Sequence, residues 1–101
     1  MAQQGKIGSH ATTVATDTNG VTRVTYHNTI VVEFSNTDII LRTGGWKSAT
    51  TKTRMNQAAK QFSLPYSVYQ KAGSWYANTP GGVIPFASDT GGEVCRITRT
   101  N

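Results

Sequence analysis

Apolar and polar residues alternate with a period of two along most of the chain, which is typical of half-buried β-strands. The alternation falls into two groups, separated by one segment with helical spacing. The first group comprises Thr12–Thr18, Val21–Tyr26, Thr29–Ser35 and Asp38–Thr43. These runs are rich in Val, Ile and Thr, which favour pleated sheets, and short turns join them. We therefore predict an antiparallel meander of four strands.

The first turn of this meander contains the dipeptide Asn19-Gly20. Asn-Gly is a strong signal for a two-residue hairpin loop of type I′, because both central residues of that turn need positive φ. The pattern predicts that conformation at Asn19 and Gly20.

Helical spacing follows at about residues 49–62. The apolar positions, spaced at i, i+3, i+4 and i+7, are Met55, Ala58, Ala59 and Phe62. A second face carries Lys52, Asn56 and Lys60. The helix should end near Ser63, because Pro65 disfavours a helical conformation at Leu64. We expect an amphipathic helix with a basic outer edge.

The second group of alternating runs comprises Tyr66–Lys71, Ser74–Asn78, Val83–Phe86 and Glu93–Arg99, with a loop expected over Ala87–Gly92. The order of elements predicts an α+β fold in which one helix covers antiparallel strands, with three or four strands after the helix. The sheet could also curl into a partial barrel. At 101 residues the chain has room for one domain, which we place at 12–101 after a polar, flexible arm at 1–11.

Charge is distributed unevenly. The net formal charge is +5, and no acidic residue occurs between Asp38 and Asp89. The cationic residues in that gap are Arg42, Lys47, Lys52, Arg54, Lys60 and Lys71. This pattern favours an anionic partner, such as nucleic acid or a nucleotide, and it also fits a basic, solvated surface.

The chain offers little for catalysis or metal binding. Its acids are scattered, and its histidines, His10 and His27, fall in the polar arm and in a predicted turn. The single cysteine, Cys95, excludes an internal disulfide and a cysteine-based zinc site, and its strand-like surroundings predict a buried, inert thiol. We expect no enzyme activity, no cofactor and no metal.

The chain has no apolar run long enough for a membrane helix and no signal-peptide pattern, so we expect a soluble, intracellular protein.

The start of the predicted helix is the candidate anion site. A helix N-terminus exposes unpaired N–H groups and carries partial positive charge. The two glycines before it would let a ligand approach the backbone, and Ser48 or Thr50 is the expected N-cap. The predicted ligand-binding residues are Gly45, Trp46, Lys47, Ser48, Thr50, Thr51, Lys52 and Arg54. The alternative is that the hydroxyl groups only cap the helix and the lysines only solubilise it.

Aromatic residues of the same acid-free segment could stack on bases, which is a sequence-tolerant mode of binding. The candidates are Tyr69, Trp75 and Tyr76. Alternation places Trp75 and Tyr76 on opposite faces of one strand, so one of them should be in the core. Tyr69 shares a face with Lys71 and is the better candidate for an outer face.

The run Gly44–Gln57, with the pattern GGWxxxTTKxRMNQ, resembles a family of short uncharacterised proteins from phages and environmental viruses. Val68–Tyr76 and Ile84–Phe86 share the resemblance, which extends over about Lys6–Phe86. It implies a phage-encoded protein, and no catalytic or binding residue can be carried over from it.

Three function classes remain open. The first is a non-enzymatic protein that binds a phosphate-bearing ligand, nucleic acid or a nucleotide, during host takeover or counter-defence. The second is a structural or assembly protein of the virion. The third is a protein inhibitor of a host enzyme. The first and third predict the host cytoplasm as location and the second predicts the virion, and free sheet edges make a homo-oligomer an additional expectation.

Overall fold

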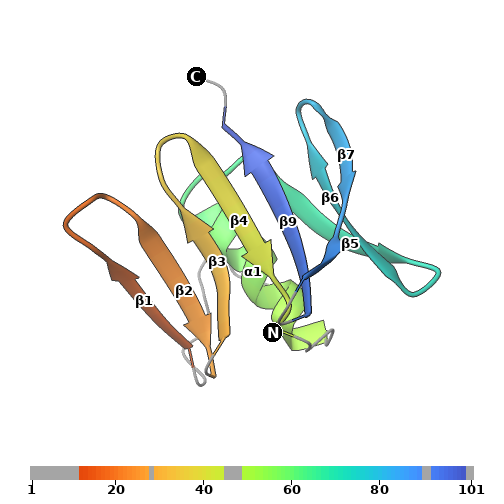
Figure 1. The fold of residues 1–101 in the computed structure, drawn as a ribbon, viewed down its shortest axis with the longest axis horizontal. Coiled ribbons are helices and arrows are strands. Elements are labelled where there is room, and N and C mark those ends of the chain that lie inside the picture. The colour runs from red at the N-terminus through yellow and green to blue at the C-terminus, as the bar shows by residue number, and fades with distance from the viewer. Residues whose placement is uncertain (1–11, 28, 45–48, 90–91, 100–101) are drawn as a thin grey trace.

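The computed structural model describes residues 12–27, 29–44, 49–89 and 92–99, and it has the predicted α+β fold (Figure 1). The elements are β1 (Thr12–Thr16), β2 (Thr22–Tyr26), β3 (Thr29–Phe34), β4 (Asp38–Arg42), α1 (Ala49–Gln61), β5 (Ser67–Lys71), β6 (Ser74–Thr79), β7 (Gly82–Pro85), β8 (Ala87–Asp89) and β9 (Gly92–Thr98). The predicted flexible arm at 1–11 lies outside the described residues.

The predicted four-strand meander is confirmed. It forms most of an antiparallel sheet with the strand order β1-β2-β3-β4-β9-β8. The last long strand, β9, returns to pair with β4, and Leu41 lies opposite Cys95 in that pairing. Because β1 and β8 are edges, the six-stranded sheet is open and does not close into a barrel.

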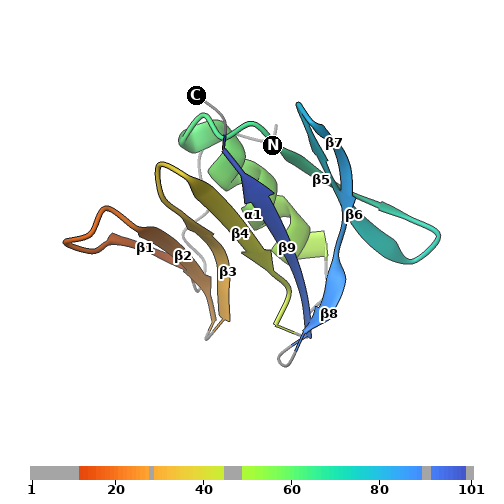
Figure 2. The same ribbon diagram turned by 45° about the horizontal axis from the view of Figure 1, so that its top comes forward.

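Helix α1 lies across one face of this sheet (Figure 2). The apolar stripe predicted from its sequence points inward: Met55 and Ala58 are fully buried and Ala59 nearly so. They pack with Val24, Val32, Ile39, Leu41 and Ile97 of the sheet in one hydrophobic core. At the end of the helix, the ring of Phe62 contacts the ring of Phe34 at 5.0 Å between centroids.

A second, three-stranded antiparallel sheet has the order β5-β6-β7 and lies beside β9 (Figure 1). The chain passes from this sheet to the larger one at Phe86, whose N–H donates to the carbonyl of Trp75 at 3.0 Å. The next residues form β8, in which Ala87 pairs with Val94. The predicted loop over Ala87–Gly92 is therefore wrong for its first residues. A strand of three residues is too short to give a detectable alternation.

The β1–β2 turn also differs from its prediction. The N–H of Gly20 donates to the carbonyl of Asp17 at 3.1 Å, and the N–H of Asp17 donates to Val21 at 2.9 Å. Gly20 has φ 83°, whereas Asn19 is not among the described residues with positive φ. The predicted type I′ turn is therefore wrong, and the pattern fits a longer loop with a glycine bulge. The Asp17 carboxylate, which accepts from the N–H groups of Asn19 and Val21, favours this arrangement.

Helix α1 ends in a left-handed residue, Ser63, with φ 54°. The N–H of Leu64 donates to the carbonyl of Ala59 at 2.8 Å, and the N–H of Ser63 donates to that of Lys60 at 3.4 Å. These two bonds, with the buried side chains of Leu64 and Ala59, define a Schellman cap, whose left-handed position is most often glycine. With this cap the helix ends at Gln61, and the left-handed turn at Ser63 directs the chain towards β5.

Glycine at position 63 should stabilise the protein. Left-handed backbone costs a non-glycine residue about 1–2 kcal/mol, and the greater flexibility of unfolded glycine offsets part of that gain. Ser63 is exposed, so its side chain loses little packing. We expect Ser63→Gly to raise the free energy of unfolding by about 0.5–1 kcal/mol in urea denaturation. Ser63→Ala serves as the control, and an equal gain from both changes would contradict the cap.

Candidate binding surface

The predicted anion site at the start of α1 is described only in part. Gly45, Trp46, Lys47 and Ser48 lie outside the described residues. Gly44 has φ 62°, and a side chain there would collide with Thr29, so the chain needs glycine at this point. In the first helical turn, Thr50 is exposed and Lys52 is half-buried, but Thr51 is completely buried. Thr51 therefore faces the protein interior and is not placed to contact a ligand.

Arg54 also has a different place from the one predicted. Its side chain is 9% exposed and lies between the helix and the first two strands. Its Nε donates to Oγ1 of Thr12 at 3.0 Å, and its guanidinium lies 5.5 Å from the centre of the Tyr26 ring. A second bond, at 3.2 Å, goes to Oε1 of Gln57. Arg54, predicted as a ligand-binding cation, therefore joins α1 to the sheet in this structure.

The three aromatic candidates for base stacking, Tyr69, Trp75 and Tyr76, differ in how deeply they are buried. Trp75 is 1% exposed and packs edge-on against Phe86 at 5.8 Å, so it belongs to the core and not to a stacking surface. Tyr69 and Tyr76 are opposite each other on β5 and β6, with rings stacked at 5.4 Å and an angle of 25°. Tyr69 is 37% exposed. This confirms the prediction that one of Trp75 and Tyr76 is core and that Tyr69 lies on an outer face.

Strand alternation gives this outer face its other members. Ser67, Tyr69 and Lys71 project to the same side of β5, and all three are exposed. Val68, between them, is buried beneath the sheet. Over the four residue steps from Ser67 to Lys71 the strand extends about 13 Å. Hydroxyl, aromatic and cationic groups therefore follow one another along one surface.

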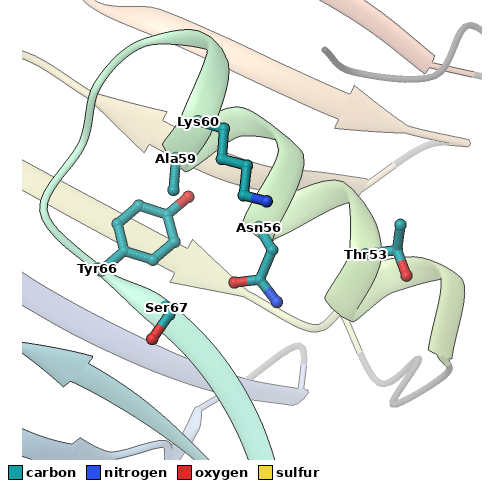
Figure 3. A pocket seen from close by; sticks show the side chains of 6 residues that line it. All are labelled: Thr53, Asn56, Ala59, Lys60, Tyr66 and Ser67. Atoms are coloured by element: carbon teal, nitrogen blue, oxygen red, sulfur yellow. The ribbon is translucent and has the colours of Figure 1, made fainter. Parts of the chain in front are cut away.

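A groove adjoins the start of this surface, between the outer side of α1 and the beginning of β5 (Figure 3). Its volume is about 350 Å³, and its lining residues are Thr53, Asn56, Ala59, Lys60, Tyr66 and Ser67. Lys60 is the cationic group of the groove, and Figure 3 shows its ammonium directed along the helix towards Asn56. Ser67 belongs to both the groove and the outer face of β5, so the two surfaces are continuous.

Asn56 fixes the distance between the helix and β5. Its Nδ2 donates to the carbonyl of Val68 at 3.0 Å, and its Oδ1 accepts from the N–H of Val68 at 2.7 Å. The amide thus acts as a neighbouring strand would and satisfies both backbone groups of Val68 at this edge. Below it, the buried hydroxyl of Tyr66 donates to the carbonyl of Met55 at 2.7 Å, and burial raises the pKa of this phenol far above its usual value.

Acidic residues lie elsewhere. All of those in the described ranges belong to the six-stranded sheet or its turns, namely Asp17, Glu33, Asp38, Asp89 and Glu93. Glu33 binds Arg42 at 2.8 Å and Arg23 at 3.6 Å, and Asp17 binds Arg23 at 2.8 Å. The hydrogen bond from Arg23 holds the pKa of Asp17 below its usual value. All charged residues of α1 and of the small sheet are cationic. Within the described part of the chain, no ion pair joins Lys60 or Lys71 to an acidic residue.

We call the surface formed by Lys60, Ser67, Tyr69, Lys71 and Tyr76 the basic aromatic face. Sequence reasoning found Tyr69 and Tyr76 and placed Lys60 on the outer edge of the helix, but it missed Ser67 and the structural role of Asn56. The spacing of Asn56 and Lys60 on one helical face was the available signal. Their contact with β5, a distant segment, has no local sequence signature.

A second cavity of about 430 Å³ lies between the β6–β7 turn and β9. It is bounded by Pro65, Pro80, Ile84 and Ile97, and Arg96 supplies its cation. None of the residues predicted for ligand binding lines this cavity. Of the predicted site residues, the stacking candidates Tyr69 and Tyr76 lie on the basic aromatic face.

Within the described ranges, no group of three or more His, Cys, Asp or Glu side chains could hold a metal ion, and α1 is too short and too polar to cross a membrane. The Cys95 thiol is buried as predicted, and burial raises its pKa to about 11. A thiol in that state is a weak nucleophile at neutral pH.

Comparison with known proteins identifies a family. The family model of the Kyanoviridae Gp96 protein matches residues 1–94. The chain belongs to this family. The Kyanoviridae Gp96 proteins are phage proteins, so the phage origin implied by the sequence resemblance is confirmed. The matched region includes α1 and the whole basic aromatic face. No curated protein and no solved structure matches the chain.

Proposed function

We propose that this Gp96 protein is a non-enzymatic binding protein that holds single-stranded nucleic acid on the basic aromatic face. One observation carries the proposal: Lys60, in the groove beside Ser67, and Lys71 lie towards the two ends of β5, and between them the exposed Tyr69 stacks on the half-buried Tyr76. This part of the chain contains no acidic residue. Lysines at both ends can neutralise successive phosphates while a base stacks on a tyrosine. This is the usual design of surfaces that bind single strands without sequence preference.

An extended ligand fits this face better than a small nucleotide. The tyrosines and Lys71 lie on the flat surface of a sheet, and the adjoining groove supplies Lys60 as its cation. A nucleotide site is normally a concave pocket that encloses most of its ligand. A strand of nucleic acid can instead follow β5 from the groove to Lys71. The proposed place of action is the host cytoplasm, during host takeover or counter-defence, so purified phage particles should lack the protein.

Binding can be measured by fluorescence anisotropy with a labelled oligothymidine of about 12 nucleotides, a length within the range of known single-strand sites. The logarithm of the affinity should fall linearly with the logarithm of the salt concentration. Lys60→Gln and Lys71→Gln should each weaken binding and reduce the magnitude of the slope by about 0.7. Tyr69→Ala should weaken binding by about 5- to 150-fold with an unchanged slope, and Tyr69→Phe should retain most of the affinity.

The matched control is Arg96→Gln. Arg96 is exposed on β9 and lies opposite Ile40, on the sheet face away from α1, so the change removes the same charge outside the basic aromatic face. It should leave affinity and slope nearly unchanged. Failure to bind at low salt would refute the proposal. Equal loss in Arg96→Gln and Lys60→Gln would show that net charge, and not this face, attracts the oligonucleotide.

A further inference from the structure

The edge strand β1 has none of the features that protect sheet edges in monomeric proteins. Its sequence, TTVAT, contains no charge and no proline, and its last four residues are exposed. Exposed strand edges normally carry charges, prolines or bulges, or are covered, because their free N–H and C=O groups can pair with another chain. Val14, in the middle of this strand, is 43% exposed, so its apolar side chain is in contact with solvent.

The other sheet edges in the described ranges are each protected. The opposite edge of the large sheet, β8, has only three residues. In the small sheet, the Asn56 amide occupies the edge of β5 at Val68, β5 carries the charge of Lys71, and β7 ends at Pro85. Short length, occupation by a side chain and proline all oppose strand addition. Among these edges, β1 is the one that has five residues and neither a charge nor a proline.

The hydrogen-bond pattern shows which groups of β1 face outward. Asp17 is bonded to Val21 at the hairpin end, and bonded pairs alternate with non-bonded pairs in an antiparallel ladder. Ala15 and Thr13 therefore bond to β2, opposite Arg23 and Thr25. The N–H and C=O of Val14 and of Thr16 point away from the sheet.

We propose that β1 pairs with β1 of a second copy of the chain, antiparallel and centred on Val14. In this register the outward N–H and C=O of Val14 exchange two hydrogen bonds with those of the partner's Val14. The two valine side chains lie next to each other and shield apolar surface from water. No like charges meet, because the strand is uncharged. The six-stranded sheets of both copies would join into one continuous sheet.

The edge of β1 is best suited to bind a second copy of itself. The strand is neutral, and its side chains are nearly symmetric in size about Val14, so two antiparallel copies are complementary. Closed two-fold dimers are the commonest homo-oligomers. β1 lies at one end of the molecule and β5 and β6, which carry most of the basic aromatic face, lie at the other (Figure 1). Dimerisation would therefore leave the proposed nucleic-acid surface exposed.

Sedimentation equilibrium over a range of protein concentrations tests this interface. The wild-type protein should be dimeric at high concentration. Val14→Lys, which places two like charges opposite each other, should be monomeric across the range. Val14→Pro should also be monomeric and folded, because the N–H that it removes points outward. The matched control is Val83→Lys, at a valine of the small sheet that is 52% exposed, and it should dimerise as the wild type does.

A monomeric wild type at every concentration, or a Val14→Lys variant that still dimerises, would overturn the proposal. The circular dichroism spectrum of each variant shows whether it is folded. Because the proposed contact places the two copies of residue 14 next to each other, Val14→Cys should be cross-linked by a short thiol-reactive linker far more than Val83→Cys. Binding of a short oligothymidine by Val14→Lys should match the wild type, so a failure of the dimer is distinguishable from a failure of nucleic-acid binding.

Discussion

Replacing Trp75 with alanine should lower the free energy of unfolding by about 3–5 kcal/mol, the usual range for removing a large buried aromatic side chain. Trp75 is the largest fully buried side chain of the described residues. It belongs to β6 of the small sheet and to the single hydrophobic core, and Phe86 packs against its ring. Native proteins are stable by only about 5–15 kcal/mol, so this variant should be close to unfolding at room temperature.

Urea denaturation followed by circular dichroism measures the effect. The matched control is Tyr69→Ala, which removes a neighbouring aromatic side chain from the outer face of the same sheet. Its loss should be near 1 kcal/mol, the contribution of a cross-strand aromatic pair. Equal losses in the two variants would mean that Trp75 does not anchor the small sheet. The indole Nε1–H has no hydrogen-bond partner among the described residues, so the loss comes from packing alone.

Asn56→Ala should lower the free energy of unfolding by about 2–4 kcal/mol. The change leaves both the N–H and the carbonyl of Val68 without their partner. An unsatisfied backbone group in a partly buried position costs about 1–3 kcal/mol. Two such groups would together cost about 2–6 kcal/mol. Water that enters from the groove can compensate for part of this loss, which lowers the upper limit to about 4 kcal/mol.

Amide hydrogen exchange provides a specific readout for Asn56. The N–H of Val68 should exchange much faster in Asn56→Ala, whereas the core amides of β3 and β4 should follow only the global loss of stability. Thr53→Ala, at another residue of the groove, is the control and should change little. Unchanged protection of Val68 in Asn56→Ala would contradict the role of the side-chain amide.

The fold was predictable where signals are local. Alternation located the meander, and the spacing of Met55 and Ala58 located the buried stripe of α1. The pairing of β9 with β4 was not predictable, because it joins segments that are distant in sequence. β8 was missed because three residues cannot establish a period. The turn at Asn19-Gly20 depends on the carboxylate of Asp17, outside the dipeptide.

At the start of α1, residue type suggested that Thr51 and Arg54 bind a ligand, whereas helical spacing indicates that both are buried. Thr51 and Arg54 precede Met55 and Ala58 at the spacing i, i+3, i+4 and i+7, so they belong to the buried stripe. A cationic side chain is usually exposed, but the hydrogen bonds of Arg54 to Thr12 and Gln57 and its contact with the Tyr26 ring compensate for its burial. For Trp75 and Tyr76, alternation showed that they face opposite ways. Only tertiary packing decides which face meets the core.

The most direct test of the proposed function is an amide NMR titration of the isotope-labelled protein with oligothymidine. We predict chemical-shift changes centred on Ser67, Tyr69, Lys71 and Tyr76 and extending to Lys60. The amides around Arg96 and Val14 should not shift. Saturable shifts on the basic aromatic face would support its role as the nucleic-acid surface. Shifts confined to the Arg23, Arg42 and Arg96 side of the large sheet, or no shifts at low salt, would contradict it.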